Sequence, residues 1–326
     1  MPAPTDPLGS VVIAVLTYKR ADDLPVLLPL LVEQAASVPE DVSVLVVDND
    51  PAGSAEQTVR GLGLAEVRYV VEPTPGIAAA RNRALDEASE AHLMVFIDDD
   101  ERPAPTWLAA LLACYRRDRP AAVAGAVVPD LGLIDDPWIL AGGFFVRQRH
   151  ATGTELQTAS TANLLLDLDQ VRALGNVRFD ERFGLSGGSD TLFTRTLTRN
   201  GGRLVWCDEA SVTDHIRVQR LTRRWVLQRH FRSGNSWSRT CLDLEITAWG
   251  RLRTRIALTV QGLGRVVAGS LRTALGVARR SLRDQAKGSR TAARGTGMTV
   301  GAWGGVYVEY HRRTPGRPAG QGGVRR

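Results

Sequence analysis

The stretch VFIDDDERP, from Val95 to Pro103, joins an apolar run to four consecutive acids, Asp98 to Glu101. Like charges placed side by side repel each other, and burying them without partners is costly. A solvated turn after a buried strand would leave the acids harmless in water. A cation site would instead use the carboxylates as ligands. The rest of the sequence decides between these two interpretations.

The composition is that of a globular protein with a core. Apolar residues make up 44% of the 326 residues, which is enough for one large domain or two smaller ones. The three cysteines lie far apart without a CxxC pair, which argues against a zinc knuckle or a disulfide framework and fits a reducing cytoplasm. We expect no secretory signal at the N-terminus. No apolar run reaches the roughly 18 residues of a membrane-spanning helix.

Charge is distributed unevenly along the chain. Residues 1–216 contain 18 Lys or Arg against 31 Asp or Glu, a balance of −13. Residues 217–326 contain 23 Lys or Arg against 4 Asp or Glu, a balance of +19. This asymmetry indicates that the C-terminal third meets an anionic surface, either membrane or nucleic acid.

Short apolar runs alternate with helical patterns in the first half of the chain. The predicted strands are 11–18, 42–48, 67–71, 92–98 and 121–128, and the predicted helices are 22–35, 76–88 and 105–117. The second half is less regular, with strands at 161–168 and 204–207 and a helix at 189–202. Continuous apolar strands between helices are typical of a mostly parallel sheet covered on both faces. Ligands bind beyond the carboxyl ends of such strands, where Thr17, Asp48 and Asp98 fall.

This placement favours the cation interpretation. No GxxxxGK[ST] or GxGxxG phosphate loop is present, so a bound nucleotide would need other positive charge to neutralise its phosphates. Asp98 and Asp100 would project to the same side of an extended chain, with Asp99 pointing away to the scaffold or a ribose. A divalent cation held by one or two carboxylates and by diphosphate oxygens suits this arrangement.

In order along residues 11–235, the sequence resembles glycosyltransferase family 2, the inverting nucleotide-sugar transferases of the GT-A fold. The segments that carry the resemblance are VLTYKR, VVDNDPAGSA, PTPGIAAARNRALDEA, FIDDDERPAPTWL, LDLDQVRALGNVRFDERFGLSGGSDTLFTR and RRWVLQRHFRSGN. The closest likeness is to members that build bacterial polysaccharides, the succinoglycan-type glucosyltransferases. We therefore expect an α/β protein of the GT-A fold, with a mostly parallel, Rossmann-like sheet flanked by helices and a basic helical C-terminal extension.

The resemblance implies roles for residues on the donor side. Thr17 and Arg20 match first-loop residues near the nucleotide. Asp48 matches the acid that reads the uracil edge, although it could instead cap its own turn. Arg81 matches a contact to the base or diphosphate, although it could instead be an exposed helix cation.

By the same resemblance, the DxD segment and Asp190 carry the chemistry. Asp98 and Asp100 match the acids that bind metal and ribose, so they would hold Mn²⁺ or Mg²⁺, while Asp98 and Asp99 would contact the nucleotide sugar. Asp190 matches the second acid of the family's Glu-Asp motif, the usual catalytic base, although it could also be a helix N-cap. Ser189 stands where that motif has its first acid, so no helper role is transferred to it. A single base is what one inversion requires.

We expect three parts along the chain. The GT-A catalytic domain would span 1–244, with a nucleotide-sugar half to about residue 130 and an acceptor half over 131–244. A basic amphipathic helical extension would cover 245–310, and a disordered tail 311–326. Residues 253–285 carry apolar residues at near-helical spacing between arginines. Three interpretations are open for this segment: it lies on an anionic membrane surface, it packs on the catalytic body, or it binds nucleic acid. We prefer the membrane surface.

The resulting hypothesis is an inverting glycosyltransferase. It would move a sugar from a nucleotide-diphosphate donor, preferably UDP-linked, to a hydroxyl of a lipid-linked glycan in cell-surface or exopolysaccharide synthesis. It would work in the cytoplasm at the inner face of the membrane, without a nucleic-acid partner. One alternative is a nucleotidyltransferase, which would want a glycine- and lysine-rich loop where this chain has TYKRADDLP. The other is a membrane- or nucleic-acid-binding protein with a catalytically silent domain, against which Asp98, Asp100 and Asp190 argue.

Overall fold

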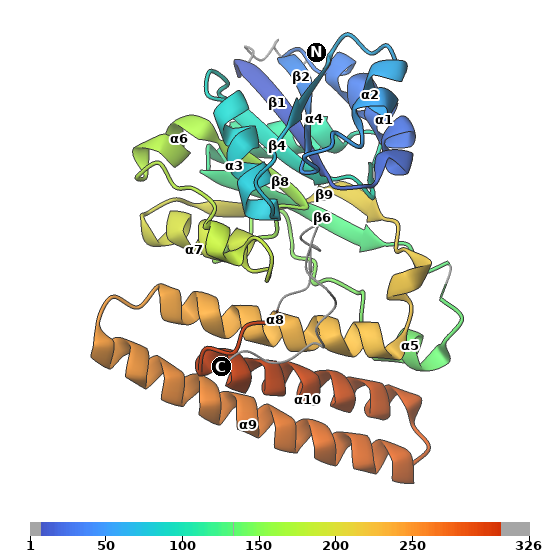
Figure 1. Cartoon of the computed structure of the whole chain (residues 1–326), viewed down its shortest axis with the longest axis vertical. Coiled ribbons are helices and arrows are strands. Elements are labelled where there is room, and N and C mark those ends of the chain that lie inside the picture. Colours follow the sequence, from blue (N-terminus) through green and yellow to red (C-terminus); the bar gives the residue numbers. More distant parts are fainter. Residues whose placement is uncertain (1–7, 133, 308–326) are drawn as a thin grey trace. The chain divides into compact units, whose positions relative to one another are not determined.

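The computed structural model describes residues 8–132 and 134–307 (Figure 1). Their contacts divide the chain into two compact units. The first unit comprises Met1–Pro129, Arg147–Glu181 and Ser189–His215, and the second comprises Asp130–Val146, Arg182–Gly188 and Ile216–Arg326. The domain boundary expected near residue 244 stays a prediction. The tail expected at 311–326 lies outside the described residues.

The first unit is built on a sheet to which the described residues contribute nine strands. These are β1 (Ser10–Thr17), β2 (Asp41–Asp48), β3 (Val67–Val71), β4 (Leu93–Asp98), β5 (Glu101–Pro103), β6 (Ala122–Pro129), β7 (Glu155–Leu156), β8 (Asn163–Asp167) and β9 (Leu204–Asp214). Their order is β3-β2-β1-β4-β8-β6-β9-β5, with β7 paired to β9. The first four of these strands, and β6 with β9, pair in parallel. Strands β5, β7 and β8 run antiparallel to their neighbours.

Both faces of this sheet are covered, because its central strands are apolar at successive positions. Along β1, the odd-numbered residues from Val11 to Val15 join one hydrophobic core and the even-numbered residues from Val12 to Leu16 join another, since side chains alternate across a strand. The first core is completed by α1 (Leu24–Ala36), α2 (Glu56–Gly61) and α4 (Trp107–Asp118). The second is completed by α3 (Ile77–Glu87), α6 (Leu168–Ala173) and α7 (Ser189–Arg199). The predicted α/β class with helices on both faces is confirmed.

The second unit is helical. Its helices are α5 (Pro137–Gly142), α8 (Arg223–Asp243), α9 (Ala248–Ala278) and α10 (Leu282–Ala302), and α10 packs against both α8 and α9 (Figure 1). The helical pattern expected over 253–285 is interrupted at Arg280, which has a φ of 51°. Ser281 then caps α10 by accepting a hydrogen bond from the backbone N–H of Asp284. Across the described helices, none is long and apolar enough to cross a membrane.

Glycines allow α9 and α10 to approach closely. A Cβ atom added at Gly269 would lie 2.5 Å from the backbone nitrogen of Ala292 and 2.6 Å from the carbonyl oxygen of Gly288. The same close approach to a neighbouring helix recurs at Gly262, Gly276, Gly288, Gly295, Gly297 and Gly301. The packing of α8, α10 and α9 therefore depends on backbone contacts rather than on large side chains.

Gly269→Ala should destabilise the protein, because the added methyl group has no room between α9 and α10. Overpacking of this kind costs about 1–3 kcal/mol. Gly264→Ala is the matched control on the same helix: its Cβ would meet nothing within 4 Å, so the higher helix propensity of alanine should add up to about 1 kcal/mol of stability. Denaturant unfolding measures both effects. Equal stability of the two variants would contradict the close packing.

Candidate functional site

Three predicted site residues end neighbouring strands. Thr17 is the last residue of β1 and pairs in register with Asp48, the last residue of β2. Asp98 is the last residue of β4, which lies on the other side of β1. Because β2, β1 and β4 are parallel, their carboxyl ends meet at one edge of the sheet, where ligands bind in such folds. The prediction that these residues fall at strand carboxyl ends is confirmed.

Three of the four acids of the acidic turn, residues Asp98–Glu101, are buried, and Asp98 is partly exposed. Asp99, Asp100 and Glu101 are 4%, 6% and 1% exposed, so the solvated-turn interpretation is wrong. The chain turns at residues 99 and 100 between β4 and β5. The extended geometry assumed for Asp98 and Asp100 is therefore also wrong, and the relation between the two carboxylates is set by the turn.

Asp99 is held by the scaffold. Its Oδ2 accepts a hydrogen bond from the hydroxyl of Thr17 (2.9 Å), and its Oδ1 accepts one from Arg20 (3.1 Å). The same nitrogen of Arg20 lies 3.2 Å from Oδ2 of Asp100. One guanidinium thus bridges two neighbouring carboxylates and offsets part of their repulsion. Contact of Asp99 with a donor stays a prediction.

The other two acids of the turn, Asp98 and Glu101, have raised pKa values. Burial raises the pKa of Asp98 to about 6; the carboxylate of Asp100 adds to the rise, and Arg81 opposes it. Burial raises the pKa of Glu101 well above its usual value, with Asp98 adding to the rise and Arg147 opposing it. Oε2 of Glu101 accepts the backbone N–H of Asp98 (3.1 Å). Its Oε1 is buried without a hydrogen-bond partner among the described residues.

Further contacts tie the acidic turn to the end of β9. Arg147 donates a hydrogen bond to Asp214 (3.0 Å), the last residue of β9, and Asp214 pairs with Glu101 across the β5–β9 ladder. The backbone N–H of His215 donates to the carbonyl oxygen of Asp100 (3.0 Å). Arg147 and Asp214 are 67 residues apart in sequence. No local motif indicates this pair, so neither residue was predicted from the sequence.

The acidic turn suits a hard divalent cation. Such an ion prefers oxygen ligands, and it is commonly held by one or two carboxylates together with phosphate and water oxygens. Asp98 and Asp100 repel each other in the protein alone, and a cation would relieve that repulsion. Within residues 8–132 and 134–307, we find no group of three His, Cys, Asp or Glu side chains that could hold a metal ion by itself.

Asp48 organises the loop after β2. Its Oδ1 accepts the backbone N–H of Asp50 (3.0 Å). Its Oδ2 accepts the backbone N–H of Ala55 and the hydroxyl of Tyr69, both at 2.8 Å. The carboxylate is buried, so the turn-capping role that the sequence left open is present. Reading of a base by Asp48 stays a prediction.

Asn49 fixes the segment that leads into α3. Its side-chain amide donates to the carbonyl oxygens of Glu72 (2.9 Å) and Thr74 (2.7 Å), and its Oδ1 accepts the backbone N–H of Gly76 (3.0 Å). Gly76 has a φ of 125°, which other residues rarely adopt. Asn in a turn segment signals side-chain bonds to nearby backbone. Here the partners lie 23 to 27 residues away, and the sequence did not reveal them.

Arg81 links α3 to α7. Its guanidinium donates to the hydroxyl of Ser189 (2.8 Å) and lies 5.4 Å from the ring centroid of Phe179. Arg81 is only 9% exposed, so the exposed-cation interpretation is wrong. Asp190 lies in the first turn of α7, next to Ser189. Since Arg81 also acts on the charge of Asp98, it connects the acidic turn with the start of α7.

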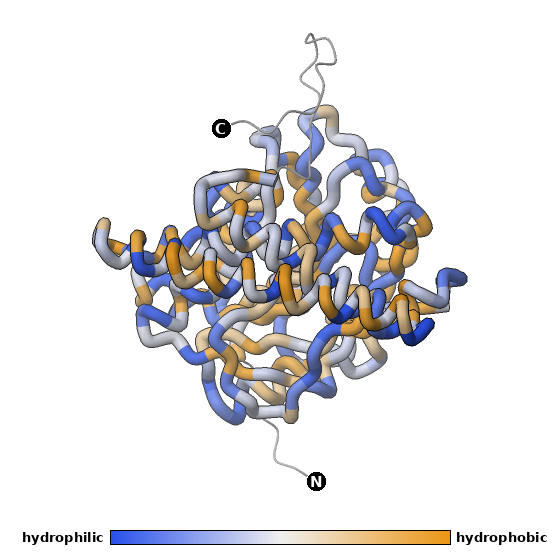
Figure 2. Tube along the Cα trace, turned by 90° about the horizontal axis from the view of Figure 1, so that it is seen from below, coloured by the Kyte–Doolittle hydropathy of each residue, from blue (hydrophilic) through white to orange (hydrophobic). Residues whose placement is uncertain are grey.

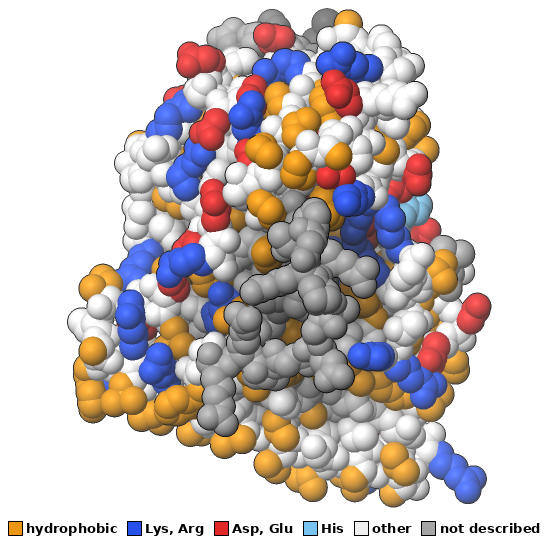
Figure 3. All heavy atoms as spheres, in the orientation of Figure 1, with side chains coloured by type: hydrophobic (Ala, Val, Ile, Leu, Met, Phe, Trp, Pro, Cys, Tyr) orange, Lys and Arg blue, Asp and Glu red, His pale blue; other side chains and the backbone are white. Residues whose placement is uncertain are grey.

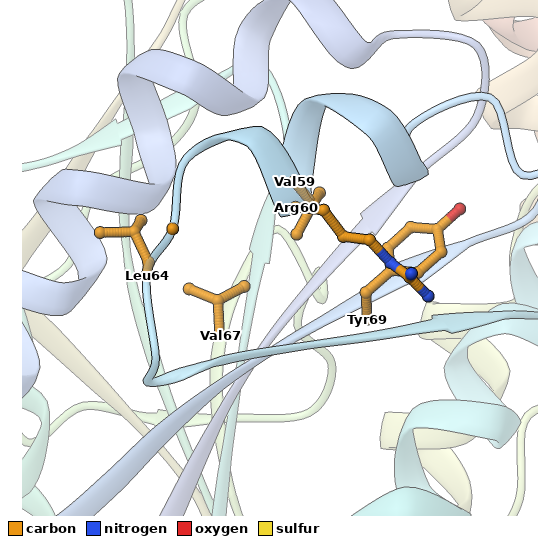
Figure 4. Close-up of a pocket in the computed structure, with 6 residues that line it drawn as sticks. Val59, Arg60, Leu64, Val67 and Tyr69 are labelled. Atoms are coloured by element: carbon orange, nitrogen blue, oxygen red, sulfur yellow. The ribbon is translucent and has the colours of Figure 1, made fainter.

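A surface pocket of about 320 Å³ lies on the first unit between α2 and β3 (Figure 4). Its lining residues are Val59, Arg60, Gly63, Leu64, Val67 and Tyr69. No predicted site residue lines it, although the hydroxyl of Tyr69 bonds to Asp48. The acidic turn contributes nothing to this pocket, and we assign no ligand to it.

Comparison of sequences gives one family and one curated relative. Residues 11–174 match the sequence model of glycosyl transferase family 2. The chain is 35% identical over 232 residues to the succinoglycan biosynthesis protein ExoM of Rhizobium meliloti (strain 1021), which covers 70% of this chain and 74% of the relative. The family match contains Thr17, Asp48, Arg81 and the acidic turn, and it ends before Asp190.

Comparison of structures gives glycosyltransferases. Mannosyltransferase PcManGT from Pyrobaculum calidifontis, in complex with GDP-Man and Mn²⁺, aligns with a TM-score of 0.60 at 18% identity, over 90% of this chain and 87% of that one. S. aureus TarS 1-349 in complex with UDP-GlcNAc aligns with a TM-score of 0.52 at 15% identity, over 96% and 99%. At these identities the likeness concerns the fold alone, and it confirms the expected GT-A fold.

Asp48→Ala should destabilise the fold, because two buried backbone N–H groups lose their acceptor. An unsatisfied buried donor costs about 1–3 kcal/mol. Tyr69→Phe is the control: it removes one bond to the same carboxylate and should cost only about 0.5–1.5 kcal/mol. Denaturant unfolding compares the two. An Asp48→Ala variant as stable as the wild type would show that the carboxylate does not organise this loop.

Proposed function

The chain belongs to glycosyltransferase family 2, and we propose that it transfers a sugar, with inversion, from a nucleotide-diphosphate donor to an acceptor hydroxyl. This reaction needs a base for the hydroxyl proton and stabilisation of the leaving diphosphate. Asp190 is the proposed base. The observation that carries the proposal is the position of Arg81, which contacts Ser189 beside that base and acts on the charge of Asp98.

Donor binding is assigned to the edge where β1, β2 and β4 end. Thr17 and Arg20 hold the Asp99 side chain in place where these strands end. Asp48 and its loop would receive the base, either through the carboxylate or through the backbone that it fixes. The PcManGT complex contains GDP-Man and the TarS complex contains UDP-GlcNAc, which supports a nucleotide sugar. We favour a UDP-linked donor.

Asp98 and Asp100 would hold Mn²⁺ or Mg²⁺ together with the donor diphosphate. When bound there, the ion supplies positive charge to the leaving group. The mutual repulsion of the two carboxylates supports this assignment, as does the Mn²⁺ of the PcManGT complex. Arg20, which bridges Asp99 and Asp100, would keep the second carboxylate oriented.

Ser189 holds Arg81 through a hydrogen bond to a neutral hydroxyl. A carboxylate at this position, as in the Glu-Asp motif, would pair with the guanidinium and neutralise it. The serine hydroxyl accepts the same hydrogen bond without a charge. The positive charge of Arg81 would therefore be available to Asp98 and to a donor diphosphate, with Ser189 as a positioning residue.

The proposed acceptor is a lipid-linked glycan in the synthesis of a surface polysaccharide or exopolysaccharide. The name of the relative, a succinoglycan biosynthesis protein, supports polysaccharide synthesis. An acceptor carried by a lipid would place the reaction at the cytoplasmic face of the membrane. Peripheral association with that face is part of the proposal.

Asp190→Asn should abolish sugar transfer while nucleotide affinity stays unchanged, because the amide keeps the shape of the side chain but cannot take a proton. Loss of a general base typically lowers turnover about 10²–10⁴-fold. Release of nucleotide diphosphate from a panel of UDP- and GDP-sugars measures turnover. Asp169→Asn, at an exposed acid on α6, is the control and should behave like the wild type. Turnover of Asp190→Asn close to wild type would exclude this residue as the base.

Asp100→Ala should weaken Mn²⁺-dependent nucleotide binding and activity together, because one proposed ion ligand is lost. Glu101→Gln tests the neighbouring acid. Its raised pKa favours the neutral form, which glutamine imitates, so this variant should bind like the wild type. Calorimetric titration with UDP in the presence and absence of Mn²⁺ checks both. An Asp100→Ala variant that keeps its metal dependence would remove this residue from the proposed ion site.

A further inference from the structure

Helix α9 carries an exposed apolar stripe of seven residues. Their side chains are 41–65% exposed, and they are Leu252, Ile256, Val260, Leu263, Val267, Leu271 and Leu275. They recur every three or four residues over about 35 Å of helix. Figure 2 shows hydrophobic residues recurring along α9, and Figure 3 shows hydrophobic side chains along the edge where Figure 1 places this helix. A soluble monomer rarely exposes such a continuous surface unless a partner or a membrane covers it.

The packing of α9 is already complete without this stripe. Gly262, Gly269 and Gly276 face α10 and lie about 200° round the helix from the stripe. An amphipathic helix of a soluble protein turns its large apolar residues to the core. In α9 the small residues make the helix contact and the large apolar residues point outward. This is the arrangement of helices that pack against one another in lipid.

The charge on α9 is of one sign. Residues 246–283 contain eight arginines and no Asp, Glu or Lys. Five of these arginines lie on α9 itself, Arg251, Arg253, Arg255, Arg265 and Arg272, and Arg272 is paired with Asp284 of α10 (2.8 Å). Two copies that met through their stripes would bring like charges together, which disfavours self-association. An anionic surface is the complementary partner.

We propose that α9 docks on an anionic lipid bilayer and lies flat in its headgroup region. The stripe would face the acyl chains, and the arginines would meet the lipid phosphates. Trp249, which is 68% exposed, continues the stripe towards the start of the helix. Trp303, which is 61% exposed, is held beside α9 by a hydrogen bond from its indole nitrogen to Thr259 (3.0 Å). Tryptophan favours the membrane interface, so the two rings would anchor the docked helix.

This docking narrows the proposed membrane association to one helix face, and it does not depend on the transfer reaction. The intact protein can be tested without donor, acceptor or cation. A failure of vesicle binding would leave the assignment of Asp190 untouched, and an inactive site would leave vesicle binding untouched.

Sedimentation with vesicles tests the proposal. The wild type should sediment with phosphatidylcholine vesicles that contain phosphatidylglycerol, should be released as salt rises, and should bind pure phosphatidylcholine more weakly. The triple variant Val260→Gln, Val267→Gln, Leu271→Gln should lose at least about 100-fold in partitioning, because three apolar side chains no longer enter the bilayer. The control triple Val26→Gln, Val146→Gln, Val218→Gln changes valines that are 54–66% exposed outside α9 and should bind like the wild type.

A second variant keeps the test decisive if the triple variant does not fold, which circular dichroism would reveal. Arg253→Gln, Arg255→Gln leaves the stripe intact and should bind the anionic vesicles more weakly, with a flatter salt dependence. Three results would overturn the proposal. These are no binding by the wild type, equal binding by the stripe variant, and an arginine variant with unchanged salt dependence. A wild-type dimer that the stripe variant dissociates, without vesicle binding, would assign the stripe to a second copy instead.

Discussion

Four consecutive acids at the end of β4 constrain the first unit, because three of them are buried and burial disfavours their charged forms unless positive charge lies nearby. The positive charge comes from three distant segments. Arg20 lies in the loop after β1, Arg81 lies on α3, and Arg147 lies between α5 and β7. The compensation is unequal. Asp99 accepts hydrogen bonds from Thr17 and Arg20, whereas among the described residues no side chain donates one to Asp98; burial raises the pKa of both carboxyls. We propose that this arrangement makes the carboxyl ends of these strands a site for a cation and a diphosphate.

In the second unit, small residues determine how the helices pack. Glycines on α10 and α9 let the helices meet through their backbones, and the large apolar side chains of α9 are left outside. A helix layer of this kind gains little from hydrophobic burial along its outer face, so that face is available for another apolar phase. Acid placed at a sheet edge and apolar residues placed on a surface are both unfavourable for a protein in isolation. We propose that each feature binds a ligand.

Local pattern predicted the strands and the residues at their ends, because apolar periodicity and strand polarity are properties of short segments. Thr17, Asp48 and Asp98 could be placed in this way. The burial of Asp100 and Glu101 could not, since it depends on β9, more than 100 residues further along the chain. The bonds of Asn49 and the Arg147–Asp214 pair join distant segments in the same way. Two local features were also missed, the turn at residues 99 and 100 and the helix break before Ser281. Each depends on only a few residues, and a periodic pattern over a longer window does not detect them.

The central claim is that the acidic turn binds a cation and a nucleotide together. Thermal unfolding of the wild type with UDP or GDP, in Mn²⁺ or in a chelator, tests it most directly. A ligand at 100 times its dissociation constant stabilises the folded state by about 2.7 kcal/mol. We predict a rise of the unfolding midpoint with nucleotide and Mn²⁺ together that far exceeds the rise with either alone. No rise with any nucleotide in Mn²⁺, or the same rise in the chelator, would contradict the account.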